Sequence, residues 1–282
     1  GLLFSSYAEH LCDDMETLAS CYKIINQNPL GSAAGYGSAF PIDRTETTSL
    51  LGFETLNYNS INAQYARGKS EFIMASSFAS IALSLNKIAS DMITFASQNY
   101  SFITLGEEIS TGSSIMPHKR NPDVFELIRA KSNQLISIPN QVAMLLTNMQ
   151  SGYHRDMQIL KEIIFPAFNN LKDCIKMMCF SFEKIKINPN VMQDTRYRNA
   201  YTVEAMQDMV LKGTPYRDAY HVIASSVKSN TFKYEGKLEH VHEGSIGNLC
   251  LEEIEEKFAM KINMINEMKV KNAIKSLLSD FD

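Results

Sequence analysis

Three long stretches of helical periodicity constrain the fold of this chain more than any other feature. Apolar residues recur at helical spacing over about 60–97, 121–149 and 155–186. At about 1.5 Å per residue, the first stretch would be a rod of roughly 55 Å. Pro139 and Pro166 are expected to kink the other two. Because such helices bury their apolar faces against one another, we expect an all-α fold built around a long-helix bundle, and oligomerisation to cover the remaining apolar surface.

Shorter helical patterns complete the chain and indicate how it divides. Further helices are predicted at about 3–27, 43–51, 199–212, 216–229 and 251–279. No succession of segments alternates between apolar and polar residues as strands do. After Pro189 the sequence changes from long helices to shorter ones joined by a polar link. We therefore expect a central helical bundle over residues 1–194, which carries oligomerisation and catalysis, and a small helical C-terminal domain over residues 195–282.

Composition and charge argue against several classes of function. The 282 residues have a net formal charge of −4 and no basic stripe, which argues against nucleic acid as the main partner. No apolar run reaches the ~20 residues of a membrane helix, and the first residues lack the basic leader of a signal peptide. The five cysteines lack CxxC spacing, so reduced thiols in a cytoplasmic protein are expected. His240 and His242 lack a third ligand at suitable spacing, so no metal site is expected.

Residues 111–123, Thr-Gly-Ser-Ser-Ile-Met-Pro-His-Lys-Arg-Asn-Pro-Asp, form a loop with the equipment for proton abstraction. A hydroxyl that can act as a nucleophile or base, on Ser113 or Ser114, lies near a cation and an amide. The cation is Lys119 and the amide is Asn121. These groups suit removal of a proton from a carbon beside a carboxylate, because the cation and the amide stabilise the negative charge that develops.

The helix after this loop has a well-formed start. Asn121 is expected to cap the free amides, Pro122 suits the first turn, and Asp123 meets the positive end of the helix dipole. Helix amides that point back toward the loop favour an anion there. An ordinary surface loop before a capped helix would have a similar composition. The complete string of residues 111–123 decides in favour of a functional loop.

Two further segments fit either a ligand site or ordinary structure. Residues 28–37 are rich in glycine but match neither GxGxxG nor a phosphate loop, so nucleotide binding is not expected. Residues 153–161 open the third long helix and place Gln158 and Lys161 on one face. Taken alone, a tight turn explains the first segment at least as well, and a solvated helix start explains the second better.

Taken together, these segments resemble argininosuccinate lyases of the fumarase/aspartase superfamily. The serine loop is similar to the superfamily signature GSSxMPxKxN. Residues 28–44 are similar to the family string NPLGSxAGYG…P(I/L)DR, and residues 153–161 to YNRDLQEDK. Residues 212–219 resemble KGxPFRxAH of the family's C-terminal domain. The resemblance implies the all-α fold of the superfamily and a homotetramer in which three subunits contribute to each active site.

The resemblance also implies a reaction and a role for each matched residue. The reaction would be elimination of arginine from argininosuccinate with release of fumarate, in arginine biosynthesis and without a cofactor. Ser113 would be the base, and Lys119 and Asn121 would stabilise the carbanion-like intermediate. Glu126 would orient an active-site histidine. The substrate would be held by Ser114, Tyr153, Gln158 and Lys161.

The histidine that Glu126 would orient lies outside this sequence. None of the six histidines has the THxQ context that family members carry. We therefore expect the chain to be the C-terminal part of a longer enzyme and to be inactive alone. Two alternatives stay open: another fumarate-releasing lyase, chiefly adenylosuccinate lyase, and a non-catalytic helical scaffold derived from a lyase. Residues 28–44 and 153–161 favour argininosuccinate lyase over the first, and the intact serine loop argues against the second.

Overall fold

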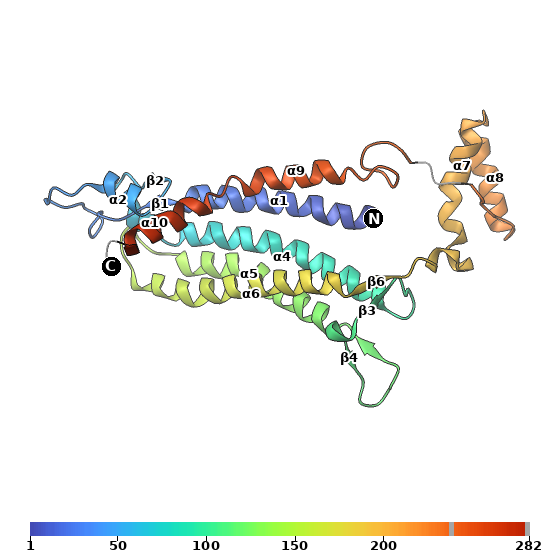
Figure 1. The fold of residues 1–282 in the computed structure, drawn as a ribbon, viewed down its shortest axis with the longest axis horizontal. Coiled ribbons are helices and arrows are strands. Elements are labelled where there is room, and N and C mark those ends of the chain that lie inside the picture. Colours follow the sequence, from blue (N-terminus) through green and yellow to red (C-terminus); the bar gives the residue numbers. More distant parts are fainter. Residues whose placement is uncertain (237–239, 280–282) are drawn as a thin grey trace.

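Long helices form the body of the computed structural model, which describes residues 1–236 and 240–279 (Figure 1). The four longest are α1 (Leu2–Ile25), α4 (Lys69–Ala96), α5 (Asp123–Leu146) and α6 (Ile159–Glu183). They lie side by side along the long axis of the molecule, and α4 contacts each of the other three. The predicted all-α bundle is therefore confirmed.

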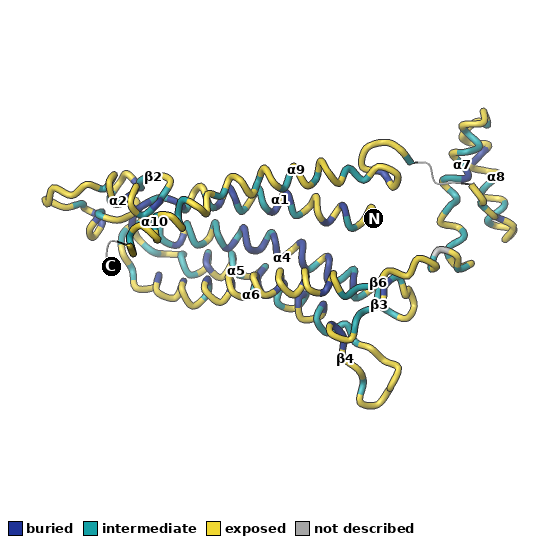
Figure 2. Tube along the Cα trace, in the orientation of Figure 1, coloured by how far each residue is buried: buried dark blue, intermediate teal, exposed yellow. Residues whose placement is uncertain are grey.

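Helix α4 is the centre of this bundle because its apolar residues face neighbours on several sides. Its buried apolar residues are Ala75, Phe78, Ala79, Ile81, Ala82, Leu85, Ile88, Ala89 and Met92. Phe125 and Leu135 of α5, and Leu171 and Met178 of α6, pack into the same core. Figure 2 shows the buried residues along the inward faces of the long helices. Full burial of one large apolar side chain stabilises the fold by about 1.5–3 kcal/mol, so this core dominates the stability of the bundle.

The prediction of a single helix over about 60–97 is wrong, because Gly68 interrupts the helix. Helix α3 (Asn62–Tyr65) is one turn long, and α4 begins directly after Gly68. Gly68 has φ +83°, which glycine adopts without steric cost, and a Cβ there would lie 2.1 Å from Leu146 Cδ2. Glu71 Oε2 accepts a hydrogen bond from the Gly68 amide at 2.6 Å and caps the start of α4. With 28 residues, α4 is about 42 Å long instead of 55 Å.

The prediction of one helix over about 251–279 is also wrong, because two helices occupy this stretch. Helix α9 (Leu251–Ile262) runs along α1, and α10 (Glu267–Ser279) lies near the other end of the bundle (Figure 1). Lys269 of α10 donates a hydrogen bond to the carbonyl oxygen of Phe53 at 2.8 Å. Helix α10 therefore packs onto the turn at Gly52 and Phe53, at that end of the molecule.

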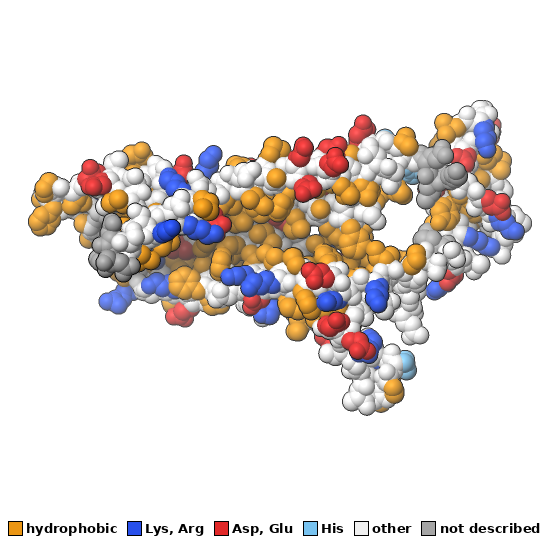
Figure 3. Space-filling view, viewed as in Figure 1, with side chains coloured by type: hydrophobic (Ala, Val, Ile, Leu, Met, Phe, Trp, Pro, Cys, Tyr) orange, Lys and Arg blue, Asp and Glu red, His pale blue; other side chains and the backbone are white. Residues whose placement is uncertain are grey.

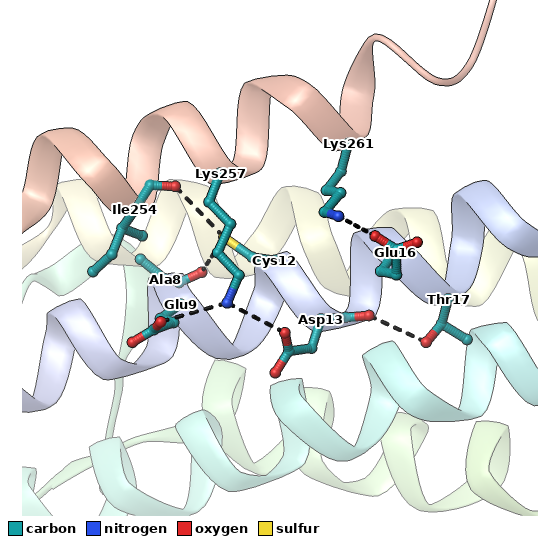
Figure 4. A network of polar contacts seen from close by, with 9 residues as sticks. All are labelled: Ala8, Glu9, Cys12, Asp13, Glu16, Thr17, Ile254, Lys257 and Lys261. Carbon is teal, nitrogen blue, oxygen red and sulfur yellow. Dashed lines mark hydrogen bonds and ion pairs between the residues drawn. The ribbon is translucent and has the colours of Figure 1, made fainter.

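Ion pairs join α9 to α1, as Figure 4 shows. Lys257 Nζ lies 3.4 Å from a carboxylate oxygen of Glu9 and 3.5 Å from one of Asp13. Lys261 pairs with Glu16 one turn further along. Acidic residues three and four apart on α1 thus face basic residues four apart on α9, which fixes the register between the two helices.

The remaining helices form a pair at one end of the molecule, apart from the bundle (Figure 1). Helices α7 (Thr202–Leu211) and α8 (Tyr216–Lys228) contact each other, and η4 (Thr195–Tyr201) leads into them. The segment from residue 195 onward therefore contributes to this pair and, through α9 and α10, to the bundle. The division into two domains at residue 194 stays a prediction.

Short strands and turns connect the helices. The paired strands are β1 (Gln27–Asn28) with β2 (Thr55–Leu56), β3 (Ile103–Leu105) with β6 (Ile185–Ile187), and β4 (Thr111–Gly112) with β5 (Arg120–Asn121). Only the first pair is parallel. The other short elements are α2 (Arg44–Leu50), η1 (Glu107–Ile109), η2 (Arg155–Gln158) and η3 (Val191–Gln193). Strands of two or three residues are too short to show alternation, so the sequence did not predict them.

One stretch within the described residues, Asn62–Ala96, is long and apolar enough to span a bilayer by length and composition alone. It contains the break at Gly68, and 56% of its most apolar window is buried inside the bundle. This is the pattern of a core helix that is covered by other helices on most sides.

Candidate active site

The serine loop, residues 111–123, projects from the bundle at the start of α5 (Figure 1). Its two sides pair as an antiparallel ladder in which Thr111 faces Asn121. The Asp123 carboxylate closes the base of the loop, because it accepts hydrogen bonds from the Thr111 backbone amide at 3.0 Å and from the Thr111 hydroxyl. The loop is therefore held at its base by backbone pairing and by one carboxylate.

The predicted capping role of Asn121 is wrong, because this residue belongs to strand β5. Pro122 occupies the N-cap position of α5, and no side chain caps the helix. Asp123 lies in the first turn, as the sequence predicts. The side chain of Arg120, the other residue of β5, forms an ion pair: its guanidinium lies 2.7 Å from a carboxylate oxygen of Glu107. This contact ties the second side of the loop to the 3-10 turn before it.

At the tip of the loop, two backbone amides donate hydrogen bonds to the Ser113 hydroxyl oxygen. Ser113 Oγ accepts hydrogen bonds from the amides of Ile115, at 3.2 Å, and Met116, at 3.0 Å. The Lys119 amide donates to the Met116 carbonyl at 3.0 Å and closes the turn. Two amides aimed at one oxygen would stabilise a negative charge on it. A serine with this local support is better suited to act as a base than a free hydroxyl.

The tip itself is open to solvent. Ser113 is half-buried, whereas Ser114 and Lys119 are exposed, and Ile115 is 86% exposed. Electrostatic stabilisation of the kind that a serine base requires is strongest where water is excluded. Another surface has to cover this tip before the loop has such an environment.

Three of the four predicted substrate-binding residues, Tyr153, Gln158 and Lys161, form a second group where α5 connects to α6. Gln158 Nε2 donates a hydrogen bond to Tyr153 Oη at 3.0 Å. Lys161 lies in the first turn of α6 and borders a cavity of about 340 Å³. All three side chains are exposed enough to contact a ligand.

Helix α5 separates the two groups of predicted site residues. Ser113, Ser114, Lys119 and Asn121 lie in the loop before α5, and Glu126 lies in its first turn. Tyr153 follows the end of α5 at Leu146. A helix of 24 residues is about 36 Å long. Figure 1 shows the β4 loop at one end of α5 and the connection to α6 at the other. Within one chain, the two groups of predicted site residues therefore do not meet, and their roles stay predictions.

Sequence reasoning missed two basic residues near Lys161. Arg67 borders the same cavity, and Lys69 borders two neighbouring hollows together with Arg67. Both flank Gly68, where a continuous helix was predicted. The tripeptide Arg67-Gly68-Lys69 was the available signal, because glycine in a helical pattern marks a possible break beside the two cations.

The glycine-rich loop at the same end of the molecule has a structural explanation. The Arg44 guanidinium donates hydrogen bonds to the carbonyl oxygens of Leu30 (2.9 Å), Asn57 (2.8 Å) and Tyr58 (3.2 Å). Gly31 has φ +81°, and a Cβ there would lie 2.9 Å from Arg44 Cγ. Glycine is required because the arginine crosses so close to the backbone.

Comparison with known proteins connects this fold and loop to one class of enzyme. A family model described as lyase matches residues 1–137. An argininosuccinate lyase from Phocaeicola vulgatus is 48% identical over 278 residues, which is 99% of this chain and 62% of that protein. An argininosuccinate lyase from Thermotoga neapolitana is 37% identical over 76% of this chain and 54% of that protein.

Solved structures agree on the fold. EDDS lyase in complex with formate superimposes with a TM-score of 0.83 at 20% identity, over 99% of this chain and 64% of that one. A class II fumarase from Schistosoma mansoni gives 0.66 at 16% identity, over 95% of this chain and 56% of that one.

Residues 1–137 match the lyase family model, and the long-helix bundle is the fold of the solved structures named above. The relatives that are 46–48% identical to the chain over nearly its whole length are argininosuccinate lyases. The chain spans about 62% of their length.

Proposed function

We propose that the protein containing this chain is an argininosuccinate lyase, a carbon–nitrogen lyase that converts argininosuccinate to arginine and fumarate. The serine loop is the observation that carries the proposal: Ser113 Oγ accepts two backbone amide hydrogen bonds within a motif that also supplies Lys119 and Asn121. The identity of 48% with an argininosuccinate lyase over 99% of the chain supports the choice of substrate.

In this reaction the loop performs the proton abstraction. Ser113 Oγ, as the alkoxide that the amides of Ile115 and Met116 stabilise, takes the proton from the carbon beside a substrate carboxylate. Lys119 and Asn121 stabilise the negative charge that spreads onto the carboxylate. The electron pair then forms the carbon–carbon double bond of fumarate as the carbon–nitrogen bond breaks. A general acid donates a proton to the departing nitrogen of arginine, which balances the proton removed at carbon. Neither metal nor cofactor is part of this scheme.

Several copies of the chain would build each site. Antiparallel association would place the serine loop of one copy beside Tyr153, Gln158 and Lys161 of another, because these groups lie at opposite ends of α5. Figure 3 shows apolar side chains gathered along the middle of one face of the bundle. Exposed apolar residues of the long helices include Leu83, Leu127, Met144, Phe165 and Phe168. A homotetramer with shared sites fits this distribution, and we propose that it is cytoplasmic as a biosynthetic enzyme.

A turnover assay with the full-length protein tests the proposal. Fumarate release from argininosuccinate is followed by ultraviolet absorbance, with adenylosuccinate as the competing substrate. We expect turnover of argininosuccinate, loss of it in Ser113→Ala, and none of adenylosuccinate. The reverse preference would favour adenylosuccinate lyase, and a full-length protein that folds but turns over neither substrate would favour the scaffold.

A further inference from the structure

Arg67 lies at the junction of three hollows at the Lys161 end of the bundle. The hollow of about 340 Å³ is bordered by Arg67, Glu71 and Lys161. Two others, of about 300 and 220 Å³, are bordered by Arg67 together with Lys69. The charged residues that line the three hollows are three cations and one carboxylate, an excess of two positive charges in a chain whose net charge is −4. This end of the molecule therefore attracts anions.

The break at Gly68 determines how Arg67 is presented. Glu71 Oε2 accepts the hydrogen bond of the Gly68 amide at 2.6 Å, and Glu71 Oε1 lies 3.3 Å from Arg67 Nε. Glu71 thus holds the Nε edge of the guanidinium against the first turn of α4. The two terminal nitrogens of Arg67 have no hydrogen-bond partner among the described residues, and the side chain is 33% exposed.

This geometry leaves the binding edge of the guanidinium free. A guanidinium whose terminal nitrogens are free offers a planar pair of donors that matches both oxygens of a carboxylate. Lys161 borders the same hollow and adds a point charge. A structural role in the ion pair with Glu71 does not by itself account for an arginine at position 67, because an i,i+4 pair at a partly exposed site contributes little to stability. The Gly68 cap also needs only the carboxylate of Glu71.

We infer that Arg67 binds a carboxylate group of the substrate together with Lys161, and that Glu71 orients it. This inference rests on the proposed function, because it takes the ligand to be the carboxylate-rich substrate of that reaction. It adds to the substrate site a residue that lies outside the motif of residues 153–161. It also gives a function to the interruption between α3 and α4.

Kinetics of the full-length protein test the role of Arg67. Arg67→Gln should raise KM for argininosuccinate about 10- to 100-fold, the effect of losing one hydrogen-bonded contact to a charged group, with kcat changed less than about threefold. KM of Arg67→Lys should lie between that of the wild type and that of Arg67→Gln, because lysine keeps the charge but lacks the planar pair of donors. The matched control is Arg217→Gln, an exposed arginine of α8, which should leave both constants unchanged. An unchanged KM in Arg67→Gln would overturn the inference.

Calorimetry provides a readout that does not depend on turnover. Fumarate should bind the full-length protein, and Arg67→Gln should weaken that binding at least tenfold. Inorganic phosphate is titrated in parallel. If phosphate binds as tightly as fumarate and with the same dependence on Arg67, the site recognises charge without carboxylate geometry, and the carboxylate assignment is wrong.

The two assays separate failure of the inference from failure of the proposed function. A wild-type protein that does not turn over argininosuccinate contradicts the proposed function, and Arg67-dependent fumarate binding still decides the inference. A wild-type protein that is active, with KM and fumarate binding unaffected by Arg67→Gln, contradicts the inference alone. Thermal unfolding is measured for each variant, and Arg67→Lys, which retains the cation beside Glu71, carries both measurements if Arg67→Gln does not fold.

Discussion

The Asp123 carboxylate and the Thr111 backbone amide, 3.0 Å apart, join the two ends of the serine loop. The Thr111 hydroxyl donates to the same carboxylate oxygen. Asp123 is also a first-turn residue of α5, so the contact fixes the loop to the helix that carries Glu126. The position of Ser113 thus depends on a residue ten positions later in the chain.

Asp123→Ala should lower kcat of the full-length protein by about 10- to 100-fold, because a small displacement of a catalytic group is costly even when the group itself is intact. KM should change less than kcat, since three of the four predicted substrate-binding residues lie at the other end of α5. Asp123→Asn keeps one acceptor oxygen and should recover part of the loss. The control is Asp218→Ala on the outlying α8, and wild-type kcat in Asp123→Ala would contradict the prediction.

Ser113→Ala should lower kcat about 10²- to 10⁴-fold, the range for a positioned proton-transfer group, and should leave substrate binding nearly unchanged. The neighbouring Ser114→Ala is the matched control and should affect KM more than kcat. Steady-state kinetics of both full-length variants decide the assignment. If Ser114→Ala shows the larger loss of kcat, the base is Ser114.

Two inactive variants should restore activity when they assemble together. In mixed tetramers of full-length Ser113→Ala and Lys161→Ala, some sites would receive an intact serine loop from one chain and an intact Lys161 from another. Random assembly from equal amounts gives both intact groups in about a quarter of the sites. Co-refolding followed by the fumarate assay measures this, with each variant refolded alone as the control. Absence of any recovery would indicate that both groups of one site come from the same chain.

Residues 1–282 alone should release no measurable fumarate from argininosuccinate. None of the six histidines in this sequence has the THxQ context of the histidine that Glu126 would orient. Loss of acid–base help and of substrate positioning together lowers the rate severely. The assay compares this segment, the remainder of the full-length protein, and a mixture of the two. Turnover by residues 1–282 alone would show that all essential groups lie within them.

Charge reversal at Lys257 should release α9 from α1. Lys257→Glu places a carboxylate beside Glu9 and Asp13, so the pair of attractive contacts becomes repulsive. Hydrogen exchange of the α9 amides should become faster at low salt, and the difference should shrink near 1 M salt as screening increases. Lys271→Glu, a matched change on α10, should leave exchange in α9 unaltered.

Most of the fold could be predicted because the long helices repeat apolar residues at 3.6-residue spacing over 24 residues or more. The breaks between consecutive helices were harder to predict from the sequence. At Gly68 the apolar pattern continues on both sides. The space that excludes a side chain there is occupied by Leu146, which lies far away in the chain, so its effect on this position is not visible locally in the sequence. Between α9 and α10 the linking residues 263–266 include neither glycine nor proline. The local signal there is Asn266, whose side chain accepts a hydrogen bond from the Lys269 amide at 3.0 Å and caps the start of α10.

The sequence allowed the chemical groups of the candidate site to be predicted, but not their positions relative to one another. The serine loop could be recognised from its residues, and its amide contacts follow from a tight turn that only coordinates reveal. The separation of Ser113 from Lys161 depends on how α5 and α6 pack, which periodicity does not specify. Arg67 was missed because its setting requires the break at Gly68.

The ion-pair contact between α9 and α1 has a consequence for the growing polypeptide. Leu251 is synthesised about 240 residues after Cys12. At 5–20 residues per second, the interval between synthesis of α1 and the start of α9 is therefore roughly 12–48 s. During that time Glu9, Asp13 and Glu16 are hydrated carboxylates, which keep this face of α1 soluble and repel other nascent chains. A late contact that includes these charges leaves that face of α1 hydrated until α9 emerges from the ribosome.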